Sequence, residues 1–241
     1  PTKGGTAVWF DQVYRLLGGK NQHILTAQVD GSQLHDRHHP NSIHRITLKR
    51  VSWLKPESLL MYLNLFTHSI WLCLRHKITT IHAGRVLPEG AIALICSKLL
   101  RIPCVIYAHG EEITTWQQHP NKRKAMRWVY QHCDTIIANS QFTQGELIKL
   151  GISSRKIKLI HPGVDTHFFR SDLPCADLRQ QLNLTPDDTL LLSVGRLSRR
   201  KGFDTVIKSL ALLNQQALPV HYALIGIGED LAYLTALATE Y

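Results

Sequence analysis

From residue 78 onward, short apolar runs alternate with segments whose apolar residues recur at helical spacing. The apolar runs predict strands over 78–82, 104–108, 135–138 and 157–160. The segments between them predict helices over 88–101, 121–133 and 141–150. Unbroken apolar strands that alternate with helices are typical of a parallel sheet covered on both faces. The sequence therefore predicts an α/β fold.

The N-terminal part of the chain follows this pattern less regularly. It predicts a helix over 7–17, strands over 23–29 and 43–48, and a polar loop over 30–42. Residues 59–74 form the most apolar stretch, but they include several polar side chains and are too few for a membrane span, which needs about 20 mostly apolar residues. We predict a buried helix there.

The alternation breaks over residues 165–187, where a polar connection with one short helix is predicted. A strand–helix–strand unit follows over 189–194, 203–214 and 220–225, and its first strand is predicted to be fully buried. We therefore expect two domains, 1–170 and 171–241, each a Rossmann-like doubly wound parallel sheet. The second has only two clear strands and is expected to be incomplete.

A basic loop joins strand 189–194 to the helix that starts at Phe203. Its charged residues are Arg196, Arg199, Arg200 and Lys201. A helix N-terminus offers unpaired amides and the positive end of the helix dipole, so such a loop suits a phosphate. An ordinary connection with solvated charges fits the same residues, and the physical pattern leaves both interpretations open.

His109 follows strand 104–108, and open α/β sheets bind ligands at the carboxyl ends of their strands. An imidazole donates or accepts a hydrogen bond near neutral pH, which suits contact with a substrate hydroxyl. The chain has 14 histidines, and position alone favours a structural role for any one of them.

The charge of the chain limits the kinds of partner that it suits, and its cysteine content indicates its cellular location. The formal net charge is +10, from 28 Lys and Arg against 18 Asp and Glu, which suits nucleic acid, anionic lipid or phosphorylated substrates. No recognisable nucleic-acid-binding module accompanies the charge, so nucleic acid is not expected as a partner. The five scattered cysteines indicate small buried hydrophobes in a reducing cytosol, and a cytoplasmic protein is expected.

Two polar clusters have alternative interpretations. The histidine-rich segment 35–39, with His44 nearby, matches no standard zinc spacing, so a solvated loop is expected and no metal site. Residues 122–124, with Arg127 and Trp128, predict a basic helix face that suits peripheral contact with an anionic membrane, at the inner face of the cell membrane. A solvated helix face fits these residues as well.

The basic loop also carries a resemblance to a known family. Val194-Gly-Arg-Leu, followed by Lys201-Gly-Phe-Asp and a helix, resembles the hallmark of family 4 retaining glycosyltransferases of the GT-B type, which have two facing Rossmann-like domains. The resemblance implies that Arg196 and Lys201 hold the diphosphate of a nucleotide-sugar donor without a metal. Arg199 and Arg200 are expected to be surface charges.

The N-terminal half resembles the same family, especially its phosphatidylinositol mannosyltransferases. The resemblance lies in Ile81-His-Ala-Gly-Arg-Val-Leu-Pro-Glu-Gly90, in Val105-Ile-Tyr-Ala-His-Gly-Glu-Glu112 and in the glycine loop Pro1-Thr-Lys-Gly-Gly-Thr-Ala7. It implies that His109 is catalytic and lies beside the transferring sugar, and that Gly4 and Gly5 approach the donor phosphates. Residues expected near the acceptor or the sugar are Arg85, Glu111 and Glu112.

Parts of the family pattern are missing from the sequence. Its Glu-x7-Glu pair does not occur, and the strand that usually precedes the glycine loop is absent. A fragment is therefore expected, with an acceptor-binding domain over 1–170 and the linker and start of a nucleotide-sugar-binding domain over 171–241. Such a fragment is expected to be inactive alone.

The leading hypothesis is a retaining glycosyltransferase that moves a hexose, mannose or glucose, from GDP- or UDP-hexose to a lipid-linked or saccharide acceptor hydroxyl. Two alternatives stay open. One is a non-catalytic anion-binding α/β protein that docks to polyanions or membrane, for which steep salt dependence and indifference to nucleotides are expected. The other is a nucleotide-sugar epimerase of the GT-B type.

Overall fold

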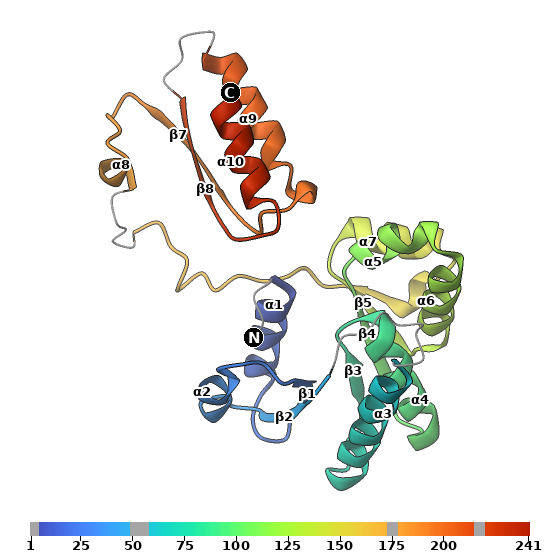
Figure 1. Ribbon diagram of the computed structural model, residues 1–241. Coiled ribbons are helices and arrows are strands. Elements are labelled where there is room, and N and C mark those ends of the chain that lie inside the picture. Colours follow the sequence, from blue (N-terminus) through green and yellow to red (C-terminus); the bar gives the residue numbers. More distant parts are fainter. Residues whose placement is uncertain (1–4, 49–57, 173–177, 215–219) are drawn as a thin grey trace. The chain divides into compact units, whose positions relative to one another are not determined.

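The computed structural model describes residues 5–48, 58–172, 178–214 and 220–241. The chain divides into two compact units, Pro1–Asp165 and Thr166–Tyr241. Within each unit, parallel strands are connected by helices (Figure 1), so the predicted α/β class is confirmed.

The strands of the first unit form two parallel sheets. One sheet pairs β1 (His23–Ala27) with β2 (Ser42–Ile46). The other contains, in spatial order, β3 (Ile81–Ala83), β4 (Cys104–Ala108), β5 (Thr135–Ala138) and β6 (Ile157–Leu159). Its helices are α1 (Gly5–Leu17), α2 (Ser32–Arg37), α3 (Ser58–Arg75), α4 (Ala91–Leu100), α5 (Glu111–Thr115), α6 (Pro120–His132) and α7 (Gln141–Lys149), with short turns η1 (Val86–Gly90), η2 (Trp116–Gln118) and η3 (Ser154–Lys156).

The two faces of the four-stranded sheet are covered by different helices. Ile106 and Ile136 are fully buried in a core shared with Tyr130 of α6. Their neighbours Tyr107 and Ile137 point to the opposite face, because successive side chains of a strand alternate, and they pack against α1. Burial on both faces explains why these strands are unbroken apolar runs in the sequence.

The predicted loop 30–42 is wrong in part, because it contains helix α2. Arg45 of β2 holds this helix through a two-pronged ion pair with Asp36, with nitrogen–oxygen distances of 2.7 and 2.9 Å. Charge pairing with the adjacent strand, rather than an apolar stripe, fixes α2. A search for apolar periodicity therefore passes over it.

The helix predicted over 59–74 forms as α3, but its predicted burial is wrong. Leu65 and Leu72 are buried, while Leu59 and Leu60 are 69% and 72% exposed. Helix α4 also exposes two apolar side chains, Ile95 and Leu99. The buried residues of α4 are Ile92, Ala93, Leu94, Cys96 and Ser97.

The second unit contains one parallel pair of strands and two longer helices. Its elements are α8 (Leu178–Gln181), β7 (Thr189–Val194), η4 (Arg199–Lys201), α9 (Phe203–Asn214), β8 (Val220–Ile225) and α10 (Leu231–Glu240). Figure 1 shows α9 and α10 on the same side of the strand pair. Leu192 and Val194 are 52% and 72% exposed, so the prediction that β7 is fully buried is wrong.

No helix in the described ranges is long and apolar enough to cross a lipid bilayer. The longest, α3, has 18 residues. Four of the five cysteines, Cys73, Cys96, Cys104 and Cys133, are buried free thiols, as expected for small hydrophobic side chains.

Candidate functional site

The ends of three neighbouring strands meet in the first unit. Gly84 follows β3, His109 follows β4 and Asn139 follows β5. The Nε2 atom of His109 lies 2.8 Å from the carbonyl oxygen of Gly84, and the Asn139 amide donates to the His109 carbonyl at 3.4 Å. These bonds place the His109 side chain at the carboxyl edge of the sheet, where open α/β folds bind ligands.

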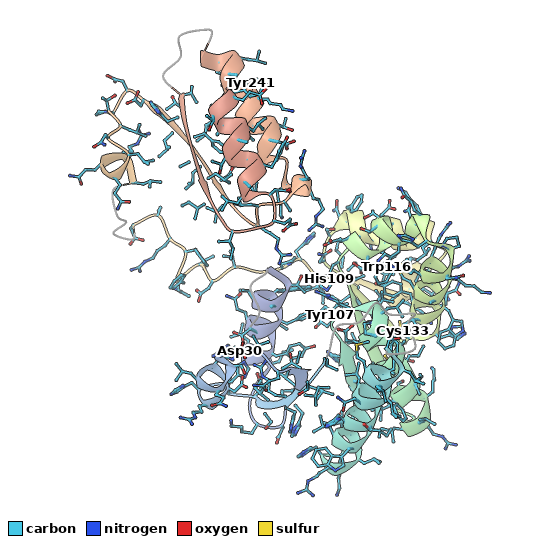
Figure 2. All side chains as sticks on the ribbon, in the orientation of Figure 1. Asp30, Tyr107, His109, Trp116, Cys133 and Tyr241 are labelled. Atoms are coloured by element: carbon cyan, nitrogen blue, oxygen red, sulfur yellow. The ribbon has the colours of Figure 1, made fainter. Side chains whose placement is uncertain are left out.

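The bond to Gly84 determines how His109 presents its second nitrogen. A carbonyl oxygen only accepts, so Nε2 carries the proton and Nδ1 of the neutral ring keeps its lone pair. The rings of Trp9 and Phe10 stand edge-on to the imidazole at 6.0 and 5.8 Å. Figure 2 shows His109 beyond Tyr107 at the end of β4. The packed rings and the carbonyl together fix its orientation.

Glu112 supports the segment that carries His109. Its Oε1 atom accepts from the His109 backbone N–H at 2.9 Å and from the Tyr130 hydroxyl at 2.9 Å. Burial and the adjacent Glu112 carboxylate raise the Tyr130 pKa well above its ordinary value, so the hydroxyl remains a donor. Of the other two residues expected near the acceptor, Glu111 begins α5 and Arg85 follows Gly84, and both are exposed.

Gly110 makes the close turn after His109 possible. Its φ angle is +87°, and a Cβ atom there would lie 2.6 Å from the Oγ1 atom of Thr143. The Thr143 hydroxyl donates to Asn139 at 2.7 Å, and its amide donates to the capping Ser140 side chain at 3.1 Å. Ser140 is therefore the N-cap of α7.

The N-terminal glycine loop is described only from Gly5, and Gly4 lies outside the described residues. Gly5 is the first residue of α1 and is exposed. A Cβ atom at Gly5 would meet nothing within 4 Å, so packing inside the protein does not require a glycine at this position.

Two cationic side chains of the basic loop in the second unit are exposed to solvent. Arg196 and Lys201 are exposed, and neither side chain forms a hydrogen bond or ion pair with the described residues. Arg199 behaves differently, since its guanidinium carbon lies 3.4 Å from the Tyr233 ring centre and its Nε atom 3.8 Å from Asp230. Arg199 therefore packs against α10.

A seam of backbone contacts holds the basic loop beside the loop that follows β8. The amides of Gly195 and Leu197 donate to the carbonyls of Ile225 and Ile227 at 3.0 and 3.1 Å. A Cβ atom on Gly226 would collide with the Gly195 carbonyl, and the equivalent atom on the glycine at 228 would collide with the Leu197 backbone. Glycines are therefore required on the β8 side of this seam.

The histidine-rich segment 35–39 is not a simple solvated loop. His39 is buried. The Nε2 atoms of His39 and His35 lie 3.0 and 3.1 Å from the Oδ1 atom of Asp11 in α1. The Asn41 amide donates to His39 Nδ1 at 3.1 Å, so His39 Nε2 carries the proton and donates to Asp11. Arg15 completes the group at 2.8 Å from Asp11. Because hydrogen bonds already use both His39 nitrogens, these residues form a polar network.

The aromatic side chains around His109 were not predicted from the sequence. Trp9 and Phe10 come from α1, far from His109 in the chain, and Tyr130 lies on the inner face of α6. The helices that carry them were predicted, and the apolar positions on those helices indicate which side chains are buried. Which strand end they surround depends on the tertiary fold.

Solved structures with similar folds identify the fold type. The chain is 22% identical to Anabaena Alr3699/HepE, solved in complex with UDP-glucose, with a TM-score of 0.76 over 99% of this chain and 63% of that one. It is 15% identical to the lipopolysaccharide outer core galactosyltransferase WaaB, with a TM-score of 0.64 over 99% of this chain and 61% of that one. The fold is of the GT-B type, as predicted.

Two protein-family models match the chain. The model of Glycosyltransferase Family 4 matches residues 4–168, and the model of Glycosyl transferases group 1 matches residues 176–241. The chain therefore belongs to Glycosyltransferase Family 4, and the predicted family is confirmed.

Curated relatives include phosphatidylinositol mannosyltransferases. The chain is 26% identical, over 68% of its length, to the GDP-mannose-dependent α-(1-6)-phosphatidylinositol monomannoside mannosyltransferase of Mycolicibacterium smegmatis, covering 43% of that protein. It is 25% identical, over 85% of its length, to the putative colanic acid biosynthesis glycosyltransferase WcaL of Escherichia coli, covering 47% of that protein. The chain thus spans about half the length of these relatives.

Proposed function

We propose that the chain is the part of a retaining glycosyltransferase that contains the acceptor-binding domain, over residues 1–170, and the first portion of the nucleotide-sugar-binding domain, over 171–241. The reaction transfers a hexose from GDP- or UDP-hexose to a hydroxyl group. The observation that carries the proposal is the oriented His109 at the carboxyl edge of the sheet, in a chain of this family.

In this proposal, His109 orients a hydroxyl group of the sugar or the acceptor. Its Nδ1 lone pair accepts a hydrogen bond from that hydroxyl, while the Gly84 carbonyl fixes the tautomer. Arg85 and Glu111 are exposed at the same edge and are proposed to contact the acceptor or the sugar. Glu112 acts through His109, because its carboxylate already holds the backbone of that residue.

Arg196 and Lys201 are proposed to bind the donor diphosphate. When the bond between the anomeric carbon and the phosphate oxygen breaks, negative charge grows on the departing nucleoside diphosphate. Two exposed cations without partners among the described residues stabilise that charge directly. The same role in other enzymes falls to a metal ion, so metal-independent transfer is proposed here. The Gly5 backbone is proposed to approach a donor phosphate, which the open space around it permits.

A lipid-linked acceptor is proposed on the basis of the α6 surface. Its first two turns carry Lys122, Arg123 and Lys124, and Trp128 is 51% exposed. An apolar hollow of about 440 Å³ lies between α6, α4 and the start of α3, lined by Tyr62, Leu87, Ala91, Asn121, Lys124, Ala125, Trp128 and Val129. Basic side chains next to apolar ones suit an anionic lipid surface.

Calorimetric titration with GDP, UDP and ADP tests the donor assignment. Selective binding of one nucleotide is expected, and Arg196→Ala or Lys201→Ala should each weaken it by about 10- to 100-fold, the loss of one charge-assisted hydrogen bond. Lys208→Ala on the exposed side of α9 is the matched control and should leave binding unchanged. Equal loss in the control, or binding that responds only to salt, would favour a general polyanion-docking protein.

Vesicle sedimentation tests the membrane contact. Binding to vesicles that contain anionic lipid is expected at low salt, with little binding to neutral vesicles. Replacing Lys122, Arg123 and Lys124 together by glutamine should abolish it, whereas Lys208→Gln should not. Binding that survives the triple replacement would place the contact elsewhere.

A further inference from the structure

A second group of histidines lies away from the carboxyl edge of the sheet. His23 is the first residue of β1, His44 lies in β2, and His76 directly follows α3. The strand register pairs His44 with Leu25, so His23 and His44 project from the same face of adjacent strands. Helix α3 leads from β2 toward the start of β3, which brings its end to this amino-terminal side of the sheet.

The three imidazoles converge. The Nδ1 atom of His23 lies 3.0 Å from the Nε2 atom of His44, and one nitrogen from each of the three rings lies within 4.8 Å of the others. Two nitrogens bound to one tetrahedral zinc ion are about 3.4 Å apart, because each Zn–N bond is about 2.05 Å long. The nitrogens are therefore close enough to share one metal ion once the rings turn their lone pairs toward it.

We propose that His23, His44 and His76 form a binding site for a divalent transition metal, Zn²⁺ above all, which fastens the end of α3 to the β1–β2 pair. Three neutral imidazoles suit Zn²⁺, Cu²⁺ or Ni²⁺ and do not suit Mg²⁺ or Ca²⁺, which prefer oxygen ligands. Water completes the coordination. The site is structural, because it lies at the amino-terminal side of the strands and shares no residue with the edge at His109.

The chemistry of the group favours a metal over protons. Burial, together with the neighbouring imidazoles, lowers the pKa values of His23 and His44 and so favours their neutral forms. Metal binding requires this neutral form. The rings of His23 and His76 are stacked with centres 3.9 Å apart, so binding of a common ion requires the His76 side chain to rotate.

The Asp11, His35 and His39 network is an instructive contrast. It also brings three potential ligands together, but a backbone amide and an arginine already engage its members. Among His23, His44 and His76, the hydrogen bonds described join only the imidazoles to one another. A metal ion would replace that single bond with three coordinate bonds and break no side-chain hydrogen bond to another described residue, although the His76 ring would shift against its edge-on neighbour Trp71.

Competition with a chromophoric chelator measures the affinity and stoichiometry of Zn²⁺ binding at the proposed site. The purified chain, freed of any histidine tag, is expected to take one equivalent of Zn²⁺. His23→Gln, His44→Gln and His76→Gln should each weaken binding by about tenfold or more, since changes even to outer-shell groups typically cost 10–100-fold. His38→Gln is the matched control, because the His38 ring follows α2 and is hydrogen-bonded to the carbonyl of Leu34 in that helix.

Two further readouts separate a site from non-specific binding. Co²⁺ at the same ligands should give the visible absorption of a tetrahedral centre, and Zn²⁺ should raise the melting temperature of the parent chain but not of His76→Gln. Binding that persists in all three variants, or that is lost only in a His35→Gln/His39→Gln double variant, would overturn the proposal. Absence of stoichiometric binding by the folded parent chain would overturn it as well.

Discussion

The backbone amide of His109 donates to the carboxylate of Glu112 at 2.9 Å, so a side chain three residues later sets the path of the segment that carries the imidazole. The same oxygen accepts the Tyr130 hydroxyl from α6. The orientation of His109 is thus tied to the core of the first unit rather than to its exposed loop alone.

This relationship makes the oxygen of Glu112, rather than its charge, the important feature. Glu112→Gln keeps an oxygen acceptor, so its free energy of unfolding should lie within about 0.5 kcal/mol of the parent value. Glu112→Ala leaves two donors without an acceptor, so its free energy of unfolding should fall by about 1–3 kcal/mol. Urea unfolding measures both. Equal losses in the two variants would mean that the negative charge itself holds the segment.

Replacing His109 should reduce turnover without weakening nucleotide binding. His109→Ala removes one hydrogen bond to a substrate hydroxyl, worth about 1.5 kcal/mol, so kcat/KM in the full-length protein should fall about tenfold or more. His38→Ala, an exposed histidine outside the proposed site, should change nothing. Parallel loss of GDP or UDP affinity would assign His109 to donor binding instead.

Gly5 and Gly145 form a matched pair of glycines, because a Cβ atom on either would meet nothing within 4 Å. Gly145→Ala within α7 should stabilise the protein by about 0.5–1 kcal/mol. Gly5→Ala should be equally well folded but bind the donor nucleotide less tightly, if the backbone there approaches a phosphate. Unchanged affinity would remove Gly5 from the proposed donor site.

Gly110→Ala should be costly, in contrast to those two substitutions. The φ angle of +87° and the close approach of the added Cβ atom to Thr143 together should lower the free energy of unfolding by about 1–3 kcal/mol. Thermal unfolding measures this loss, and a stable variant would show that the turn after His109 relaxes.

Acidic pH should destabilise the first unit through His23 and His44. Their pKa values are lowered in the folded chain, chiefly by burial, so the unfolded chain binds more protons as the pH falls. Stability should therefore decrease as the pH drops below about 6.5, the ordinary histidine value, and be recovered above it. Unfolding of His23→Gln/His44→Gln at pH 5.5 and 7.5 checks this, because the double variant should lose less stability between the two.

The strands around the site were predictable because they are buried on both faces. Strands 104–108 and 135–138 were predicted with the bounds that the structure has, and His109 was placed at a strand end. Helix α2 was missed because an ion pair holds it. The exposure of β7 was missed because an apolar run indicates a strand but does not reveal that helices cover only one of its faces.

Groups assembled from distant residues were harder to predict from the sequence. The motif around Arg196 and Lys201 is local, so its resemblance to the family was visible. The contacts of Arg199 with Tyr233 and Asp230 depend on how α10 returns to the loop. The His23, His44 and His76 group comes from three elements, and no spacing in the sequence indicates it.

The glycine seam between the loops after β7 and β8 has a thermodynamic consequence. Backbone bonds from Gly195 and Leu197, and the close approach of Gly226, already immobilise the chain that carries Arg196. An anion that arrives there orders little more than two side chains, so the conformational entropy lost on binding is small. Such a loop is preorganised, and its affinity for a diphosphate should depend mainly on charge and geometry.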